Sequence, residues 1–307
     1  MSLTAVGSIA FDAVRTPFGE RERMLGGSAV HFALAARFFT EVRIVGPTGS
    51  DFTDTEIGVL ADRGVICEDI DRIDGGDTFF WRGHYDEDMN VAHTDATELG
   101  VFGEFEPTLS PAATRSDMLF LGNIVPAIQR HVRAQSEAPF VALDSMNLWI
   151  DTARDDLEKA ISEVDCVLLN DAEIRSLTSE SNLSLAASKL LALGPRAVVA
   201  KRGEYGAALF TPEGAYVLPG LLLSEVRDPT GAGDSFAGGF LGYLDGLGPD
   251  RIDAEALRVA MAVGTVIASF NVEDFGTERV QRLERSEIDA RLDELAELTR
   301  FAALDRA

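Results

Sequence analysis

Short apolar strands alternate with helical segments through the middle of this chain, and this rhythm constrains the fold more than any other feature. Four strand-like runs occur between residues 117 and 201, with the sequences DMLFLGN, PFVALD, DCVLLN and RAVVAK. Helical periods lie between and after them, near 126–136, 151–162, 171–178 and 183–193. Such alternation is typical of a parallel sheet covered by helices on both faces, with ligands bound beyond the carboxyl ends of the strands.

The flanking segments extend this plan. Strands are expected over LTAVGSIA (3–10) and EVRIVGPTG, and a helix over DTEIGVLADRG that ends at Gly64. A hairpin is expected at 206–218, followed by three C-terminal helical runs. Two strand-rich segments, roughly 10–25 and 77–105, fall outside the rhythm, and we expect them to pair into a small sheet that covers the main one. We interpret residues 1–307 as a single domain that contains both segments.

The charge of the chain excludes several classes of partner. The formal net charge is −24, and only three of the 27 basic residues are lysines. An acidic surface repels nucleic-acid phosphates and anionic membranes, so neither is an expected partner. We hypothesise adaptation to high salt, in which a dense acidic surface stays solvated.

Location and redox chemistry follow from other features of the sequence. Cys67 and Cys166 stand far apart, in no metal or redox spacing, which fits a reducing compartment. The N-terminal stretch lacks a basic region followed by a long apolar core, and the apolar run VAMAVGTVIASF is too short to span a bilayer. A cytoplasmic protein is therefore expected.

The segment RDPTGAGDSFAGGF, residues 227–240, combines a glycine-rich turn with a following helical run. Backbone N–H groups at Gly231, Ala232 and Gly233 could approach an anion closely, and the helix dipole would favour it. The segment is neither a Walker loop nor a dinucleotide fingerprint. Asp234, one turn away, could accept a proton from an alcohol that attacks a phosphoryl group, or could simply cap the helix. The spacing alone leaves these alternatives open.

Two segments resemble signatures of the ribokinase-like, phosphofructokinase-B family of sugar kinases. DPTGAGDSFAGGF resembles the C-terminal signature and GGSAVHFALA the N-terminal one, and the order of elements agrees along the chain. The resemblance implies a three-layer α/β/α fold with a mainly parallel central sheet and a small β-sheet lid. It also implies MgATP as the donor, Asp234 as the catalytic base and Gly231, Ala232 and Gly233 as the anion hole.

The resemblance also assigns residues around the nucleotide and metal ions. Asn170 and Glu173, three apart in LLNDAEI, resemble a motif that organises Mg²⁺ and phosphates through water, although the pair also fits a helix capping box. Asp228 would help to hold a monovalent cation such as K⁺, or would only shape the turn. The cation's carbonyl ligands would come from NVEDFG, which ends at Gly276. Lys201 and Gly203, at the end of a strand, would lie near the nucleotide.

The acceptor side is expected near the first strand and the first helix. By the resemblance, Asp12 binds sugar hydroxyls, and Gly26 and Gly27 let the substrate approach the backbone. His31 stands where the family commonly has Asn, so it is either a substrate contact that alters the acceptor or a buried core histidine. Asp144 and Asn147 follow a strand, but their spacing departs from the family's Asp-x-Asn, so they receive no role.

These residues predict an ATP-dependent kinase that phosphorylates a hydroxyl of a small sugar or sugar-like alcohol. A nucleoside kinase of the same fold, for adenosine, cytidine or inosine, is the nearest alternative, because the lid aromatics Phe79, Phe80 and Trp81 and the His31 side chain could contact a base. A non-catalytic sugar- or nucleotide-binding regulatory module is the third reading. The resemblance also implies a homodimer through the lid, where unpaired strand edges favour association, whereas the dense acidic surface equally favours separate molecules at low salt, so the oligomeric state stays open.

Overall fold

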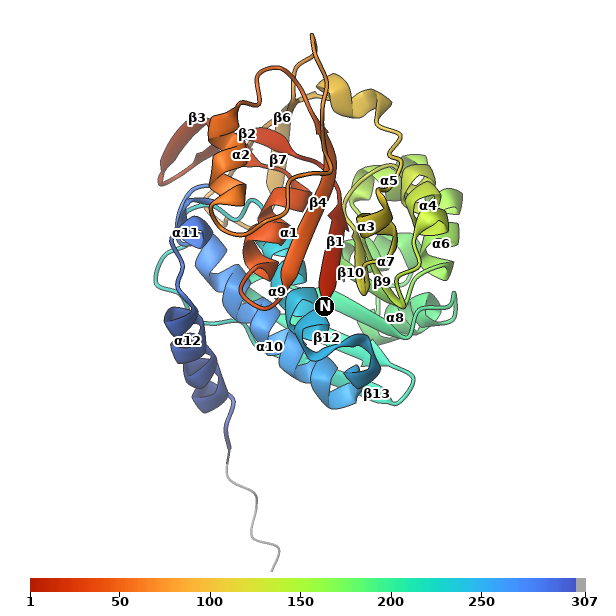
Figure 1. Ribbon diagram of the computed structural model, residues 1–307. Coiled ribbons are helices and arrows are strands. Elements are labelled where there is room, and N and C mark those ends of the chain that lie inside the picture. Colours follow the sequence, from red (N-terminus) through yellow and green to blue (C-terminus); the bar gives the residue numbers. More distant parts are fainter. Residues whose placement is uncertain (302–307) are drawn as a thin grey trace, which may run out of the picture.

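The computed structural model describes residues 1–301 and is built around a nine-stranded sheet (Figure 1). Its strand order is β13-β12-β11-β10-β9-β8-β1-β4-β5. The strands from β11 to β5 are parallel, whereas β12 and β13 form the antiparallel edge. Their bounds are β1 Ser2–Val6, β4 Glu41–Thr48, β5 Ile70–Arg72, β8 Met118–Leu121, β9 Phe140–Asp144, β10 Cys166–Asn170, β11 Ala197–Lys201, β12 Ala207–Thr211 and β13 Gly214–Leu218.

Helices cover both faces of this sheet. The helices that bury side chains in the core on one face are α1 Ser28–Ala36, α2 Asp54–Ala61, α9 Ala232–Leu247, α10 Ala254–Asn271, α11 Glu278–Gln281 and α12 Arg285–Leu298. Those of the opposite face are α3 Pro111–Thr114, α4 Pro126–Gln135, α5 Asn147–Thr152, α6 Arg154–Ser162, α7 Asp171–Thr178 and α8 Leu183–Leu191. Short 3₁₀ turns occur at Gly100–Glu104, Gly203–Tyr205 and Pro249–Arg251. The three-layer α/β/α expectation is thus confirmed.

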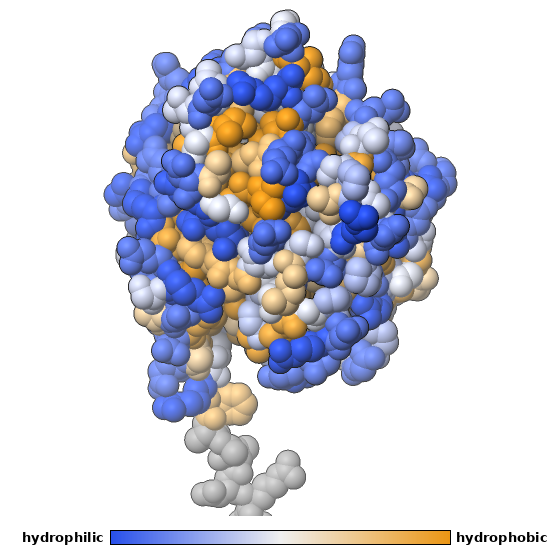
Figure 2. All heavy atoms as spheres, viewed as in Figure 1, coloured by the Kyte–Doolittle hydropathy of each residue, from blue (hydrophilic) through white to orange (hydrophobic). Residues whose placement is uncertain are grey.

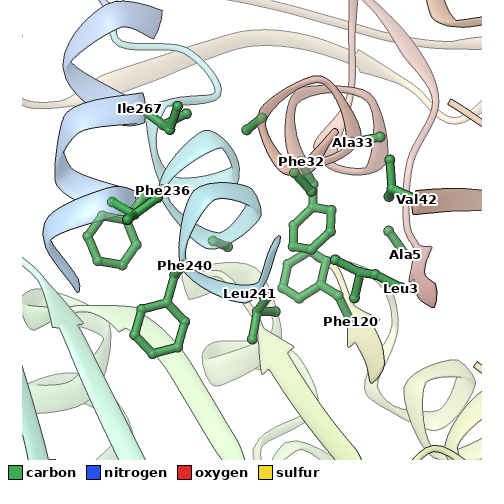
Figure 3. Close-up of a cluster of buried hydrophobic side chains, with 14 of the residues drawn as sticks. Leu3, Ala5, Phe32, Ala33, Val42, Phe120, Phe236, Phe240, Leu241 and Ile267 are labelled. Carbon is green, nitrogen blue, oxygen red and sulfur yellow. The ribbon is translucent and has the colours of Figure 1, made fainter. Parts of the chain in front are cut away.

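Alternating side chains of the strands explain why both faces are buried. In β9, Phe140 and Ala142 enter one core, and Val141 and Leu143 enter the other, as the two-residue period of a strand requires. On the first face, the ring of Phe32 in α1 stacks on Phe120 of β8 with centroids 4.1 Å apart. Figure 3 shows these two rings beside the side chains that α9 contributes to the same core.

The two strand-rich segments outside the rhythm pair into one four-stranded sheet, in the order β3-β2-β6-β7. We call this sheet the lid. Its strands are β2 Ala10–Thr16, β3 Gly19–Gly26, β6 Phe79–Tyr85 and β7 Ala92–Glu98. Neighbouring strands are antiparallel, except that β2 and β6 are parallel. The lid stands beyond the carboxyl end of β1, because the chain passes from β1 into β2 within three residues.

Two boundaries differ from the sequence-based expectation. The first strand ends at Val6 rather than at residue 10, because Ala10 already begins the first strand of the lid. The helix expected near 151–162 is two helices, since Ala153 leaves helical geometry between Thr152 and Arg154. The hairpin at 206–218 is confirmed as β12 and β13.

The surface is strongly polar. Figure 2 shows hydrophilic side chains over most of the visible face, with apolar side chains gathered near its centre. Among residues 1–301, every helix is too short or too polar to cross a bilayer.

Candidate active site

Three polar residues end three neighbouring parallel strands. Asp144 ends β9, Asn170 ends β10 and Lys201 ends β11, so their side chains meet at the ligand-binding edge of the sheet. Lys201 Nζ donates to Asp144 Oδ2 at 2.5 Å, and both side chains are largely buried. The same Nζ lies 3.0 Å from where a Cβ of Gly233 would stand. The lysine therefore sits between Asp144 and the first turn of α9.

Residues 228–234 comprise the turn before α9 and the first residues of that helix, and we call them the anion turn. Gly231 adopts φ 74°, and a Cβ there would lie 2.2 Å from His31 Nδ1, so both the backbone conformation and the close packing require glycine. Helix α9 begins at Ala232. The N–H of Ala232 donates to the carbonyl of Pro229 at 3.1 Å. Amides of a helix's first turn that lack such acceptors, together with the helix dipole, favour an anion.

Asp234 lies in the first turn of α9, beside this anion site. Burial raises the pKa of its carboxyl to about 7, Asp144 raises it further and Lys201 opposes the shift. A carboxylate with a pKa near neutrality is suited to take a proton from an alcohol. Asp234 is thus a buried carboxyl with a pKa near neutrality in the first turn of α9.

Asn170 and Glu173 form a reciprocal capping box at the start of α7. The Asn170 side chain accepts from the N–H of Glu173 at 2.7 Å, and Glu173 Oε2 accepts from the N–H of Asn170 at 2.8 Å. Burial raises the pKa of Glu173 to about 7; Lys201 opposes this shift and Asp144 adds to it. The pair therefore caps a helix and also faces the charged groups of the site.

The Asp228 carboxylate joins the anion turn to the loop after α10. Its Oδ1 accepts from the N–H of Thr230 at 2.9 Å, and its Oδ2 accepts from the N–H of Gly276 at 2.8 Å. Asp228 is fully buried, and burial raises its pKa despite these two bonds. No lysine or arginine within residues 1–301 forms an ion pair with it. This leaves a buried carboxylate that lacks a protein cation.

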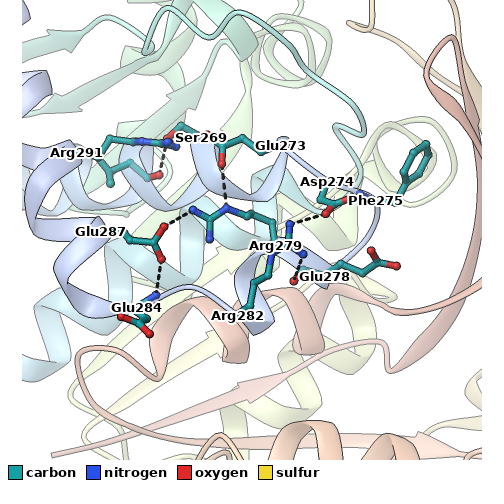
Figure 4. A network of polar contacts seen from close by, with 11 residues as sticks. Ser269, Glu273, Asp274, Phe275, Glu278, Arg279, Arg282, Glu284, Glu287 and Arg291 are labelled. Atoms are coloured by element: carbon teal, nitrogen blue, oxygen red, sulfur yellow. Dashed lines mark hydrogen bonds and ion pairs between the residues drawn. The ribbon is translucent and has the colours of Figure 1, made fainter.

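Ion pairs hold the loop that contains Gly276. Arg279 donates to Glu273 at 3.0 Å and to Glu287 at 2.6 Å, and Arg291 donates to Glu273 at 2.6 Å. Figure 4 shows this network linking the C-terminal end of α10 to α11 and α12. We call Glu273, Arg279, Glu287 and Arg291 the C-terminal ion network.

Asp12 is buried in the lid strand β2. Glycine at position 26 makes room for its carboxylate, because a Cβ there would lie 1.9 Å from Asp12 Oδ2. Burial raises the pKa of Asp12 to about 7, helped by repulsion from Asp228 and Asp234 and opposed by a backbone bond from Gly27. The lid acid and the two acids of the anion turn thus share one electrostatic environment.

His31 lies behind the anion turn. Its Nδ1 is 3.1 Å from Asn271 Oδ1, its side chain is 2% exposed, and burial lowers its pKa to about 4. Asn271 also accepts from Ser235 Oγ at 2.9 Å and donates from Nδ2 to the carbonyl of Thr230 at 2.8 Å. The contacts that the structure shows for His31 are therefore with a buried network that supports the turn. Its Nε2 is buried and has no partner within the described residues.

Gly203 begins the 3₁₀ turn after β11, with φ 54°. It therefore follows Lys201 closely at the same edge of the sheet. A Cβ on Gly203 would stand 3.6 Å from the side chain of Asn90, which lies in the connection between the lid strands β6 and β7. The structure thus places Gly203 between the main sheet and the lid.

Sequence reasoning gave no role to the side chains of Asn271, Tyr85 or Asp144, all of which contact site residues. Asp144 could have been found, because it ends its strand as Asn170 and Lys201 end theirs. Tyr85 and Asn271 carry no such signal, since only the fold brings them to the anion turn. Within residues 1–301, no cluster of three or more histidine, cysteine or acidic side chains has metal-binding geometry.

Comparisons with known proteins identify the family and support the fold. Residues 3–281 match the family model described as pfkB family carbohydrate kinase. It is 30% identical over 256 residues to a cytidine kinase of Thermococcus kodakarensis, covering 80% of this chain and 90% of that protein. The fold is similar to a Methanocaldococcus jannaschii nucleoside kinase (TM-score 0.78, 19% identity, 95% and 98% covered) and to a Thermotoga maritima ribokinase (TM-score 0.77, 21% identity, 95% and 99% covered).

Proposed function

The chain belongs to the pfkB family of carbohydrate kinases, and we propose that, within this family, its acceptor is a nucleoside. As a member it is an ATP-dependent kinase that phosphorylates a hydroxyl of a sugar or nucleoside. One observation carries the narrower proposal. Asp12 and Trp81 are direct partners on the neighbouring lid strands β2 and β6, so a carboxylate and an indole share one face of the lid.

A nucleoside matches this pair of side chains. A carboxylate accepts hydrogen bonds from two ribose hydroxyls, and an aromatic face stacks on a base for about 1–3 kcal/mol. Val14, Met24 and Phe275 form an apolar cluster against which Trp81 and Tyr85 pack. This cluster supplies an apolar wall that a free pentose does not need.

In the proposed reaction, Asp234 accepts the proton of the attacking hydroxyl. Gly231, Ala232 and Gly233 would supply the amides that stabilise the charge on the transferred phosphoryl group, although the Ala232 N–H donates to the Pro229 carbonyl at 3.1 Å in the structure. Lys201 provides a nearby cation. The His31–Asn271 network keeps the anion turn in place from behind.

The residues of the site fit a monovalent cation and Mg²⁺ in different ways. Asp228 fits a monovalent cation such as K⁺, because it is a buried carboxylate without a protein cation, beside the loop at 271–276. For Mg²⁺, which keeps several waters, Asn170 and Glu173 suffice to order water although they cap α7. Gly276 then lies at the cation, and Gly203 near the nucleotide.

A homodimer through the lid is part of the same proposal. Strands β3 and β7 are the two edges of the lid sheet. Edge strands present unpaired backbone groups that another copy can bind.

The acceptor is tested by ADP release with MgATP and K⁺, comparing cytidine, inosine and adenosine with ribose. We expect a nucleoside to give the highest kcat/KM. Replacing Trp81 by leucine should raise the KM for the nucleoside about 10-fold, whereas phenylalanine should retain most of the affinity because it can still stack.

Two results would contradict the nucleoside proposal. One is a preference for ribose over every nucleoside. The other is an equal effect of Trp81→Leu on ribose and on nucleoside, because the indole would then not contact a base.

A further inference from the structure

Thr230 makes three contacts: one within the anion turn, one with the end of α10 and one with the lid. Its N–H donates to Asp228, its carbonyl accepts from Asn271 at 2.8 Å, and its hydroxyl is 3.2 Å from the hydroxyl of Tyr85. Thr230 directly precedes Gly231, so these contacts set the position of the anion turn. The contact from Tyr85 is unlike the other two, because it comes from the lid.

Tyr85 is the last residue of β6. It lies four residues after Trp81 and therefore on the same face of the strand, the face that also carries Asp12. Its ring packs against the cluster of Val14, Met24 and Phe275. Burial raises the pKa of the Tyr85 hydroxyl; the Thr230 hydrogen bond opposes the shift, and Asp228 adds to it. The hydroxyl therefore keeps its proton and can donate it to Thr230.

We propose that Tyr85 is a positioning residue that couples closure of the lid to the order of the anion turn. With the lid in the position that the structure shows, its hydroxyl contacts Thr230 and hence fixes the amides that follow. When the lid opens, this contact is lost and Thr230 keeps only the two contacts from the body of the protein. The catalytic amides are then fully ordered only when the lid has closed, which limits transfer of the phosphoryl group to water.

Two other contacts of the lid allow the role of the Tyr85 hydroxyl to be tested without unfolding the lid. The Arg21 guanidinium of β3 lies 4.6 Å from the centre of the Phe275 ring, and Thr277 Oγ1 donates to the carbonyl of Leu25 at 3.2 Å. These contacts join the lid to the loop after α10 without involving the Tyr85 hydroxyl. Removing the Tyr85 hydroxyl should therefore leave the lid folded while freeing the anion turn.

The first test of this coupling between lid and anion turn measures kinase activity and therefore rests on the proposed function. We expect Tyr85→Phe and Thr230→Val each to lower acceptor-dependent kcat/KM roughly 3- to 10-fold, the value of one hydrogen bond. Thr230→Ser should stay within about 2-fold, because it keeps the hydroxyl. The double variant should be no worse than either single variant, as expected for two partners in one contact. The ratio of acceptor-independent to acceptor-dependent ADP release should rise in Tyr85→Phe.

A second test does not depend on the acceptor. The chain has two tryptophans, so Trp149→Phe leaves Trp81 of the lid as the only indole. In that background and without substrates, Tyr85→Phe should increase quenching of Trp81 fluorescence by acrylamide. Tyr216→Phe, in the distant strand β13, is the matched control and should change neither quenching nor activity.

The outcomes separate the two proposals. If no acceptor supports ADP release but Tyr85→Phe still increases quenching, the acceptor proposal fails and the lid contact stands. Unchanged quenching, or additive losses in the double variant, would overturn the role of Tyr85.

Discussion

The pKa of Asp234 depends on two nearby charged side chains that shift it in opposite directions. Asp144 raises the pKa of Asp234 and Lys201 lowers it. A base acts when it is ionised, so kcat/KM for ATP should fall as the pH drops below about 7. Asp144→Asn should move this acid limb to lower pH, and Lys201→Met should move it to higher pH, each by about one unit.

The pH–rate profile of the three proteins, measured with one acceptor and one ATP concentration series, checks this prediction. Lys189→Met is a suitable control, because this lysine pairs with Glu180 on the surface. Shifts in the same direction for both site variants would contradict the assignment of the limb to Asp234.

Asp245 is a buried carboxyl far from this chemistry, near the C-terminal end of α9. Burial raises its pKa to about 6, although the Thr40 hydroxyl donates to it. The folded protein therefore binds this proton more tightly than the unfolded chain, so this group's contribution to stability is present at low pH and is lost as the pH rises from about 4 to 6.

Asp245→Asn should therefore stabilise the protein at pH 8 by about 1–3 kcal/mol and have a much smaller effect at pH 4. Urea unfolding of both proteins at the two pH values measures the difference. An effect that is the same at both pH values would mean that ionisation of Asp245 does not set the change.

At the scale of elements, the C-terminal ion network fixes the loop that carries Gly276. Arg279 is 13% exposed and bridges Glu273 and Glu287. Within the described residues, its removal leaves Glu287 without an ion-pair partner and leaves Glu273 paired with Arg291 alone. Arg279→Met should lower the free energy of unfolding by about 1–3 kcal/mol. Arg300→Met removes an exposed pair with Glu297 and should cost less than about 0.5 kcal/mol. Urea denaturation compares the two, and equal losses would count against a structural role for the network.

The elements of the main sheet were predictable because their pattern is local. Strands such as β9, β10 and β11 are short apolar runs bounded by helices, and alternation of the two fixes their parallel order. The lid was predictable only as two segments outside the rhythm. The parallel pairing of β2 with β6 joins residues about 70 positions apart, and no local pattern specifies such a partner.

The site residues also divide into those that the sequence predicts and those that only the fold brings together. The glycine-rich turn and Asp234 form one continuous motif, so their proximity follows from the sequence. The contact of Lys201 with Asp144 depends on the order of the strands, and that of Tyr85 with Thr230 depends on the position of the lid. The local pattern around His31 does not predict its role, because its partner Asn271 lies 240 residues away in the sequence.

For the whole molecule, the net charge of −24 acts against the compact state. Carboxylates crowd the site as well, where burial raises the pKa values of Asp12, Glu173 and Asp234 to about 7. Repulsion of this kind weakens as salt shortens the Debye length from about 10 Å at 0.1 M to about 3 Å at 1 M. The melting temperature should therefore rise continuously with KCl up to molar concentrations.

Two cation effects can be separated in that experiment. General screening does not distinguish K⁺ from Na⁺ and develops over the whole molar range. A cation bound at Asp228 would instead saturate at a much lower concentration, would discriminate between the two ions, and would disappear in Asp228→Asn. We expect that variant to lose the first, ion-specific rise in melting temperature and to keep the later one. A melting temperature that does not rise with either salt would contradict the adaptation to high salt, because the acidic surface would then impose no measurable cost on folding.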